Sequence, residues 1–264
     1  MGLWVFGLIG LVGFLKGQGF LHTLVITLDI EFQSPGSSVI LLALFWGLGV
    51  GTIATAWLWH RRGLRSLTGK GSTTLHHFLL ASTLAFAAIG GLSLITLPFS
   101  EPPSLNMDPL TWALFLPLGL TVVAGQTFSE EILFRGYLQS QLAGRFKNPL
   151  IWMAVPSVLF GFGHYVPSFP TSAALVYVMI AIFFGLIAAD LTARTGSIGA
   201  AWGFHFANNT MAILFVVSEG SLTGLGLFKT DDTLSDQIAL SPLILIDIAI
   251  LFGVYLLIRR FTAR

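Results

Sequence analysis

The chain has 264 residues, of which 55% are hydrophobic and only 9% are charged, whereas an ordinary soluble domain carries about 25% charged residues. Its mean hydropathy is +0.84. This composition excludes an ordinary soluble protein and predicts an integral membrane protein. The formal net charge of +1 gives no reason to expect a nucleic-acid partner, and the absence of cysteine excludes disulfides, thiolate metal sites and a cysteine nucleophile.

Long apolar segments recur along the chain, so we expect an all-α fold: a polytopic α-helical membrane protein with about eight transmembrane helices around an intramembrane polar cavity. The first segment, 3–22, contains Lys16, Gln18 and His22, and a helix lying on the membrane surface is its alternative. It lacks the features of a removable signal peptide. After a loop at 23–37, spans are expected at 38–60, 77–98, 110–142, 149–164, 171–190, 198–218 and 240–258.

The charges between these spans indicate the topology. Basic residues gather at 61–70, 145–147, 194 and 259–264, whereas the loops at 101–108 and 219–239 are acidic. Eight crossings with the N-terminus inside place all four of these basic clusters in the cytoplasm, as the positive-inside rule requires. We therefore expect a single membrane domain over 1–264, in a prokaryotic plasma membrane, with both termini cytoplasmic. A surface-lying first segment would leave seven helices and an outside N-terminus.

Three polar motifs interrupt the apolar spans. An ionisable side chain at the centre of a span costs about 2.5 to 3.5 kcal/mol, so such residues usually face a protein interior or a wet cavity. Within each motif the key pair is about one helical turn apart and therefore shares a face. The motifs are Glu130, Glu131 and Arg135; Phe160 and His164; and His205 and Asn209.

Helix rise predicts that these side chains can meet. Glu130 and His164 lie about 24 and about 27 Å from the connection near Phe146, on neighbouring antiparallel helices. His205 and Asn209 lie about 15 and about 21 Å along their own helix from the turn near Thr195. A common polar cavity is therefore geometrically allowed.

Such a cavity permits two chemistries. Glu130 and His164 could activate a water molecule, with the glutamate as general base, while His205 and Asn209 stabilise the oxyanion. The same side chains could instead hold a divalent metal such as zinc, with Glu130, His164 and His205 as candidate ligands. The spacing leaves the metal open, and the His-Glu-x-x-His zinc pattern is absent.

Structural interpretations compete with these roles. Glu131 and Arg135 suit a buried ion pair between helices. His164 taken alone would be a hydrogen-bonded core histidine, and Asn209 could join two helices. Phe160 is expected to pack beside the site.

Together, and in this order on successive apolar helices, the motifs resemble those of the CAAX prenyl protease and bacteriocin-processing (CPBP) family, also called Abi proteins. The resemblance covers roughly residues 110–215, which would be the catalytic core. The matched patterns are Glu-Glu-x-x-x-Arg at Glu130, Glu131 and Arg135, Phe-x-x-x-His at Phe160 and His164, and His-x-x-x-Asn at His205 and Asn209.

The resemblance implies an intramembrane endopeptidase, a hydrolase acting on a membrane-associated protein or peptide in the lipid bilayer. Glu130 and His164 would activate water, and His205 and Asn209 would stabilise the oxyanion. Glu131, Arg135 and Phe160 would support them. The family is described both as metalloproteases and as glutamate-dependent proteases, so a metal stays open. Two other classes also stay open: a membrane transporter or proton-relay protein, and a non-catalytic immunity or scaffold protein.

Overall fold

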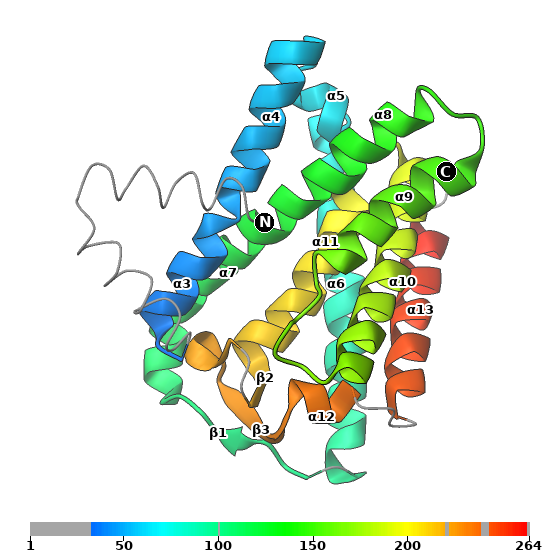
Figure 1. Ribbon diagram of the computed structural model, residues 1–264. Coiled ribbons are helices and arrows are strands. Elements are labelled where there is room, and N and C mark those ends of the chain that lie inside the picture. Colours follow the sequence, from blue (N-terminus) through cyan, green and yellow to red (C-terminus); the bar gives the residue numbers. More distant parts are fainter. Residues whose placement is uncertain (1–32, 100, 220–221, 239–242, 263–264) are drawn as a thin grey trace.

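The structure is a computed structural model that describes residues 33–99, 101–219, 222–238 and 243–262 (Figure 1). The segment expected at 3–22 and most of the loop after it lie outside the described residues. The first half of the described chain contains α3 (Pro35–Leu44), α4 (Trp46–His60), α5 (Leu64–Thr68), α6 (Gly71–Thr96), the 3-10 turn η1 (Leu97–Phe99), β1 (Ser104–Leu105), α7 (Pro109–Glu131), the π-helix η2 (Ile132–Gln139) and α8 (Ser140–Ala143).

The second half contains α9 (Pro149–Phe162), α10 (Thr171–Thr195), α11 (Gly199–Thr210), the π-helix η3 (Met211–Phe215), β2 (Val216–Glu219), the 3-10 turn η4 (Thr223–Leu225), β3 (Phe228–Thr233), α12 (Leu234–Ile238) and α13 (Leu243–Phe261). Among the described residues, four helices are long and apolar enough to cross a membrane: Pro35–His60, Gly71–Thr96, Pro109–Ala143 and Thr171–Thr195. The expected class, a polytopic α-helical membrane protein, is confirmed, while the number of eight crossings stays a prediction.

Three helices begin with the same local signal, a capping side chain followed by proline. Ser34 accepts a hydrogen bond from the backbone of Ser37 at the start of α3, and Asp108 accepts one from Thr111 at the start of α7. Asn148 caps α9 in the same way. The side chain satisfies a free N–H group and proline presets the helical φ angle, so the sequence fixes where these helices begin.

The expected span at 198–218 is wrong at its end. The helix stops at Phe215, and Val216–Glu219 form β2, which pairs in parallel with β3. β1, from the other acidic loop, pairs with β3 in antiparallel fashion, and the Asn106 side chain donates to the carbonyls of Thr223 and Gly226. The two acidic loops are thereby joined in a three-stranded sheet at one end of the bundle (Figure 1).

Two glycines set the position of α11 against α6. A Cβ atom at Gly199 would overlap the carbonyl oxygen of Thr74, and one at Gly203 would overlap that of Phe78. Small residues one turn apart let helix backbones approach closely in membranes. The contact fixes the helix that carries His205 and Asn209.

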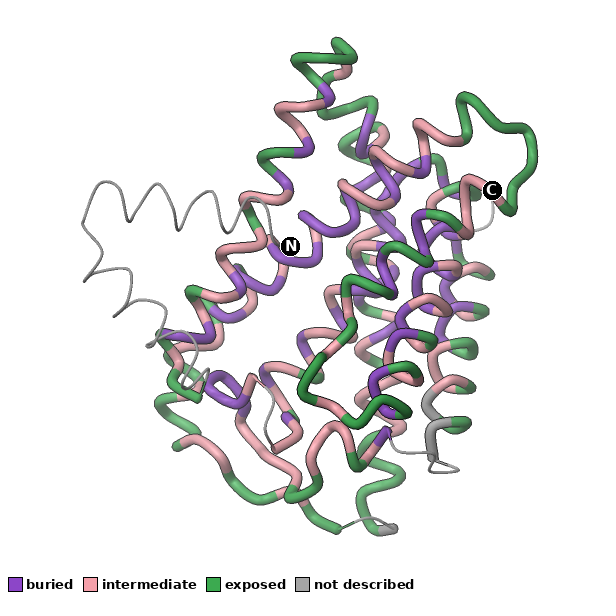
Figure 2. Tube along the Cα trace, viewed as in Figure 1, coloured by how far each residue is buried: buried purple, intermediate pink, exposed green. Residues whose placement is uncertain are grey.

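α10 is the most deeply buried of the candidate spans (Figure 2). Gln139 of η2 donates to the carbonyl of Ala189, and Arg135, one turn earlier, donates to that of Gly185. α9 also packs closely against α10, where a Cβ atom at Gly161 would come within 2.8 Å of the carbonyl oxygen of Val178. The buried core between α6, α9, α10, α11 and α13 includes Phe160, Phe184, Leu191, Phe204 and Ile258.

Candidate functional site

A buried cluster of polar side chains joins the end of α7 to α11. The His205 imidazole lies between two carboxylates: Nδ1 is 2.8 Å from Oε1 of Glu131, and Nε2 is 3.5 Å from Oε2 of Glu130. The three residues are 3%, 0% and 6% exposed for His205, Glu131 and Glu130. Two of the three sequence motifs therefore meet in the interior, as the sequence predicted they could.

The chain widens from an α-helix into the π-helix η2 directly after Glu131. Such turns occur frequently at functional sites because they change the direction in which side chains point. Arg135, buried in η2, donates from Nη1 to Oε1 of Glu131 at 3.2 Å. The ion pair expected between these residues is present, and it leaves Glu130 outside the pair.

The contacts determine which nitrogen of His205 carries a proton. Glu131, paired with Arg135, is a carboxylate that only accepts hydrogen bonds, so Nδ1 of His205 must be the donor. Nε2 is then directed at Glu130. Oε2 of Glu130 is buried and makes no hydrogen bond with the described residues, although it is within ion-pair distance of that nitrogen.

Charge is unbalanced in this cluster unless one more proton is bound. Glu130 and Glu131 carry two negative charges, and Arg135 supplies one positive charge. Burying an uncompensated charge is costly, so a proton on the Glu130 and His205 pair is favoured. The 3.5 Å between Oε2 and Nε2 is an ion-pair distance, longer than a hydrogen bond.

Asn209 lies one turn beyond His205 and contacts α7 at a residue that the sequence motifs did not include. Its Nδ2 donates to Oε1 of Gln126 at 3.1 Å. Gln126 is 5% exposed and sits one turn before Glu130. A lone glutamine on the carboxylate face of an apolar helix was the signal that could have identified it.

His164 is placed differently from His205. The expected span at 149–164 ends as a helix at Phe162, so His164 lies in the turn beyond α9. Its Nδ1 is 2.8 Å from the carbonyl oxygen of Phe160, and because a carbonyl only accepts, Nδ1 carries the proton and Nε2 is an acceptor. Among the described residues, no hydrogen bond connects His164 with Glu130 or His205.

Phe160 lies between the two histidines. Its ring centroid is 4.5 Å from that of His164 and 5.8 Å from that of His205, and the Arg135 guanidinium lies 4.5 Å from it. The expectation that Phe160 packs beside these residues is met. Sequence reasoning missed Tyr177 of α10, whose ring centroid lies 6.1 Å from that of His164. Tyr177 also interacts electrostatically with Glu130.

Glu130, His164 and His205 are the residues proposed as metal ligands. Within the described ranges, no group of three or more histidine, aspartate or glutamate side chains is arranged to hold a metal ion. Nδ1 of His205 is taken by Glu131, and Nδ1 of His164 by a backbone carbonyl. Each histidine therefore keeps Nε2, the nitrogen through which a histidine held at Nδ1 binds a metal.

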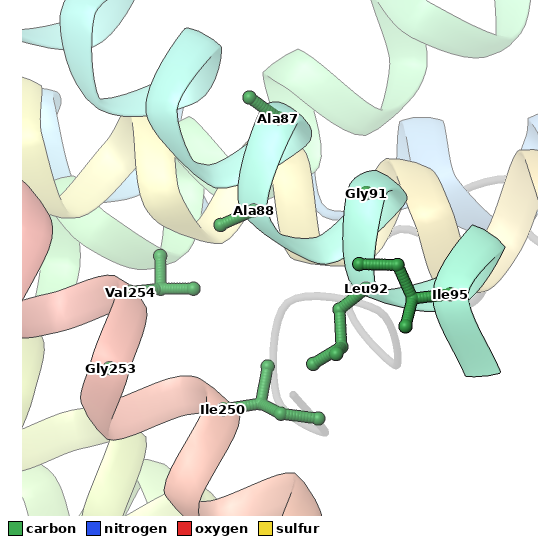
Figure 3. Close-up of a pocket in the computed structure, with 8 residues that line it drawn as sticks. All are labelled: Ala87, Ala88, Gly91, Leu92, Ile95, Ile250, Gly253 and Val254. Atoms are coloured by element: carbon green, nitrogen blue, oxygen red, sulfur yellow. The ribbon is translucent and has the colours of Figure 1, made fainter.

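An apolar groove lies elsewhere, between α6 and α13, with a volume of about 410 Å³ (Figure 3). It is separate from the polar cluster and holds no ionisable side chain. The groove is lined by Ala87, Ala88, Gly91, Leu92 and Ile95 of α6 and by Ile250, Gly253 and Val254 of α13.

The segment that contains this cluster matches a known protein family. Residues 111–211 match the family model described as type II CAAX prenyl endopeptidase Rce1-like. This segment is similar to the Rce1-like family. This agrees with the resemblance to the CPBP family, and the matched segment contains all seven residues of the three motifs.

One curated relative is the uncharacterized protein YyaK of Bacillus subtilis (strain 168), which is 31% identical over 127 residues. The match covers 47% of this chain and 42% of the relative, so it spans less than half of that protein's length. No solved structure matches the chain.

Proposed function

We propose that the chain is an intramembrane endopeptidase that hydrolyses a peptide bond of a membrane-associated protein or peptide. The observation that carries this proposal is the His205 imidazole held between Glu130 and Glu131 inside a segment similar to the Rce1-like family. Glu131 and Arg135 form the supporting ion pair, which leaves Glu130 for proton transfer. The lipid bilayer supplies the surroundings, with both chain termini in the cytoplasm.

Glu130 and His164 activate the water molecule. Glu130 has a buried oxygen without a hydrogen bond to the described residues, and such a carboxylate is a strong acceptor for a water proton. His164 offers Nε2 as an acceptor, since its Nδ1 proton is used by Phe160. The two side chains hold the two hydrogens of one water, so that its oxygen faces the scissile carbonyl.

The oxyanion is stabilised from α11. With Nδ1 donating to Glu131, a second proton on Nε2 makes His205 an imidazolium, which balances the charges of the two carboxylates and Arg135. Asn209 supplies an Nδ2–H from one turn away on the same face. Donors that are already fixed before the reaction contribute most, because they need not reorganise as charge develops.

Proton transfer through Glu130 then completes the reaction. Water adds its oxygen to the carbonyl carbon while Glu130 takes one proton, and the C–N bond breaks as Glu130 returns that proton to the leaving amine. The products are a carboxylic acid and a free amine, so every atom of the water is accounted for. No step is assigned to a metal.

The test is a comparison of peptides released from membranes that contain the native chain or Glu130→Gln. This substitution preserves side-chain volume, so insertion should be retained while a defined set of cleavage products falls at least about 100-fold. Glu101→Gln, which alters an exposed carboxylate outside the helices, is the matched control and should release the native products. Unchanged products in Glu130→Gln would refute the peptidase.

Two further outcomes identify the alternatives. Flux that depends on an ion gradient and survives His205→Ala would indicate a transporter. A biological effect that both Glu130→Gln and His164→Ala retain would indicate a non-catalytic protein. Adding a chelator to the native membranes addresses metal dependence separately, because loss of cleavage that returns with zinc would require a metal-bound water.

A further inference from the structure

Gln126 differs from the two buried hydroxyl residues near it on α7. Thr127 and Ser129 hydrogen-bond to carbonyls of their own helix, at Val123 and Gly125. The Gln126 side chain instead leaves its helix and accepts a hydrogen bond from Asn209 of α11 at 3.1 Å. A buried polar side chain that reaches a neighbouring helix fixes that neighbour's position as well as its own.

The contact also fixes which way the Asn209 carboxamide points. A free carboxamide can turn by half a rotation, which exchanges its donor NH₂ group for its acceptor oxygen. Gln126 Oε1 accepts from Asn209 Nδ2, and Asn208 Nδ2 lies 3.4 Å from Asn209 Oδ1 as a donor. Both ends of the carboxamide are therefore held, and the residues that the structure describes leave one Nδ2–H available.

The two helices form matched pairs at this point. On α7, Gln126 precedes Glu130 by one turn, and on α11, Asn209 follows His205 by one turn. Gln126 contacts Asn209, and Glu130 faces His205. A shift of α11 along α7 would break both pairs together, so the first pair keeps the second in register.

We propose that Gln126 is a positioning residue of the peptidase, which holds the Asn209 carboxamide so that its remaining Nδ2–H is directed at the oxyanion. This inference rests on the proposed function. Gln126 acts through Asn209, and its removal should slow the chemical step while leaving substrate binding nearly unchanged.

The contact can be tested without any activity, because the chain contains no cysteine. Gln126→Cys combined with Asn209→Cys should form a disulfide in membranes under mild oxidation. Gln126→Cys combined with Ala207→Cys is the control, since Ala207 belongs to the apolar core on another face of α11. Absence of the first disulfide, or equal formation of both, would overturn the contact between Gln126 and Asn209.

The role is tested with a fluorogenic peptide copied from a cleavage site that depends on Glu130. We expect Gln126→Met to lower kcat by about 10- to 100-fold, somewhat less than loss of an oxyanion donor itself, and to leave KM within about twofold. Gln139→Met is the matched control, because Gln139 is equally buried on the same continuous helix but donates to Ala189 of α10. Its kcat should stay within about twofold of the native value.

A double-mutant comparison separates positioning from general stability. If Gln126 acts through Asn209, then Gln126→Met should add nothing to the loss caused by Asn209→Ala. Additive losses, or a native kcat in Gln126→Met, would overturn the positioning role while the peptidase assignment stands. Cleavage that persists in Glu130→Gln would instead overturn the proposed function, and the cysteine pair would still report whether the two side chains meet.

Discussion

The polar seam between α7 and α11 and the apolar groove between α6 and α13 are opposites. The seam, defined by Gln126, Glu130, Glu131, Arg135, His205 and Asn209, is closely packed and buried, whereas the groove has a volume of about 410 Å³ and no ionisable side chain. In a bilayer, lipid tails can fill an apolar groove at little cost, but a buried charge needs a partner. The seam therefore indicates where the functional site lies, and the groove does not.

The largest expected effect on stability follows from breaking the seam at Arg135. Arg135→Met preserves much of the side-chain volume but leaves Glu131 buried with one partner fewer, and removes the contact with the Gly185 carbonyl. We expect the free energy of unfolding to fall by about 3 to 5 kcal/mol. Reversible unfolding in mixed micelles measures this loss.

Arg135→Lys is the control for that substitution. A lysine restores the charge but cannot donate in two directions from a planar group, so it should recover only part of the loss. Equal stability of Arg135→Met and the native chain would show that the seam is not held by this ion pair.

The next largest effect should come from the contact that holds α11 in place. Gly203→Ala puts a methyl group onto the Phe78 carbonyl oxygen, which belongs to the backbone of α6 and cannot turn away. Overpacking of this kind costs about 1 to 3 kcal/mol and should also lower cleavage, because His205 lies on the displaced helix. Thermal unfolding and peptide release from the same preparation test both effects.

The sequence predicted these helices better than their interruptions. Apolar length identified the spans at 38–60 and 110–142, which the structure gives as Pro35–His60 and Pro109–Ala143. It could not show that the helix after His205 ends at Phe215, because Val216 and Val217 are as compatible with an apolar helix as with a strand. Their pairing with Phe228 and Lys229 decides the outcome, and that contact is not local in the sequence.

The sequence predicted which residues form the site, but it predicted only some of the contacts between them. Helical spacing correctly paired Glu131 with Arg135, since both lie on one helix. The sequence could not show that His205 would lie between the two carboxylates, nor that Asn209 would contact Gln126, because these contacts depend on how α11 packs against α7. Gly199 and Gly203 set the position of α11 against α6, and its position against α7 depends on contacts that are equally non-local in the sequence.

His164 should separate activity from stability. Among the described residues, its Nδ1 hydrogen-bonds to a backbone carbonyl of the preceding turn alone, and the side chain is half-buried. His164→Ala should therefore cost no more than about 1.5 kcal/mol of unfolding free energy. Cleavage should nevertheless fall by about 100- to 10,000-fold, because a water acceptor is lost. Cleavage that falls only in proportion to the folded fraction would assign His164 a structural role.

The smallest effect is expected in the groove. A methyl group at Gly253 would meet no atom within 4 Å, in contrast to one at Gly203, although both glycines lie on helices of the same bundle. Gly253→Ala should therefore change the unfolding free energy by less than about 0.5 kcal/mol and leave cleavage at the native rate. Because alanine is also the better helix former, a slight gain in stability is the expected sign. A marked loss of cleavage with intact stability would mean that substrate occupies the groove, and the contrast between seam and groove would no longer hold.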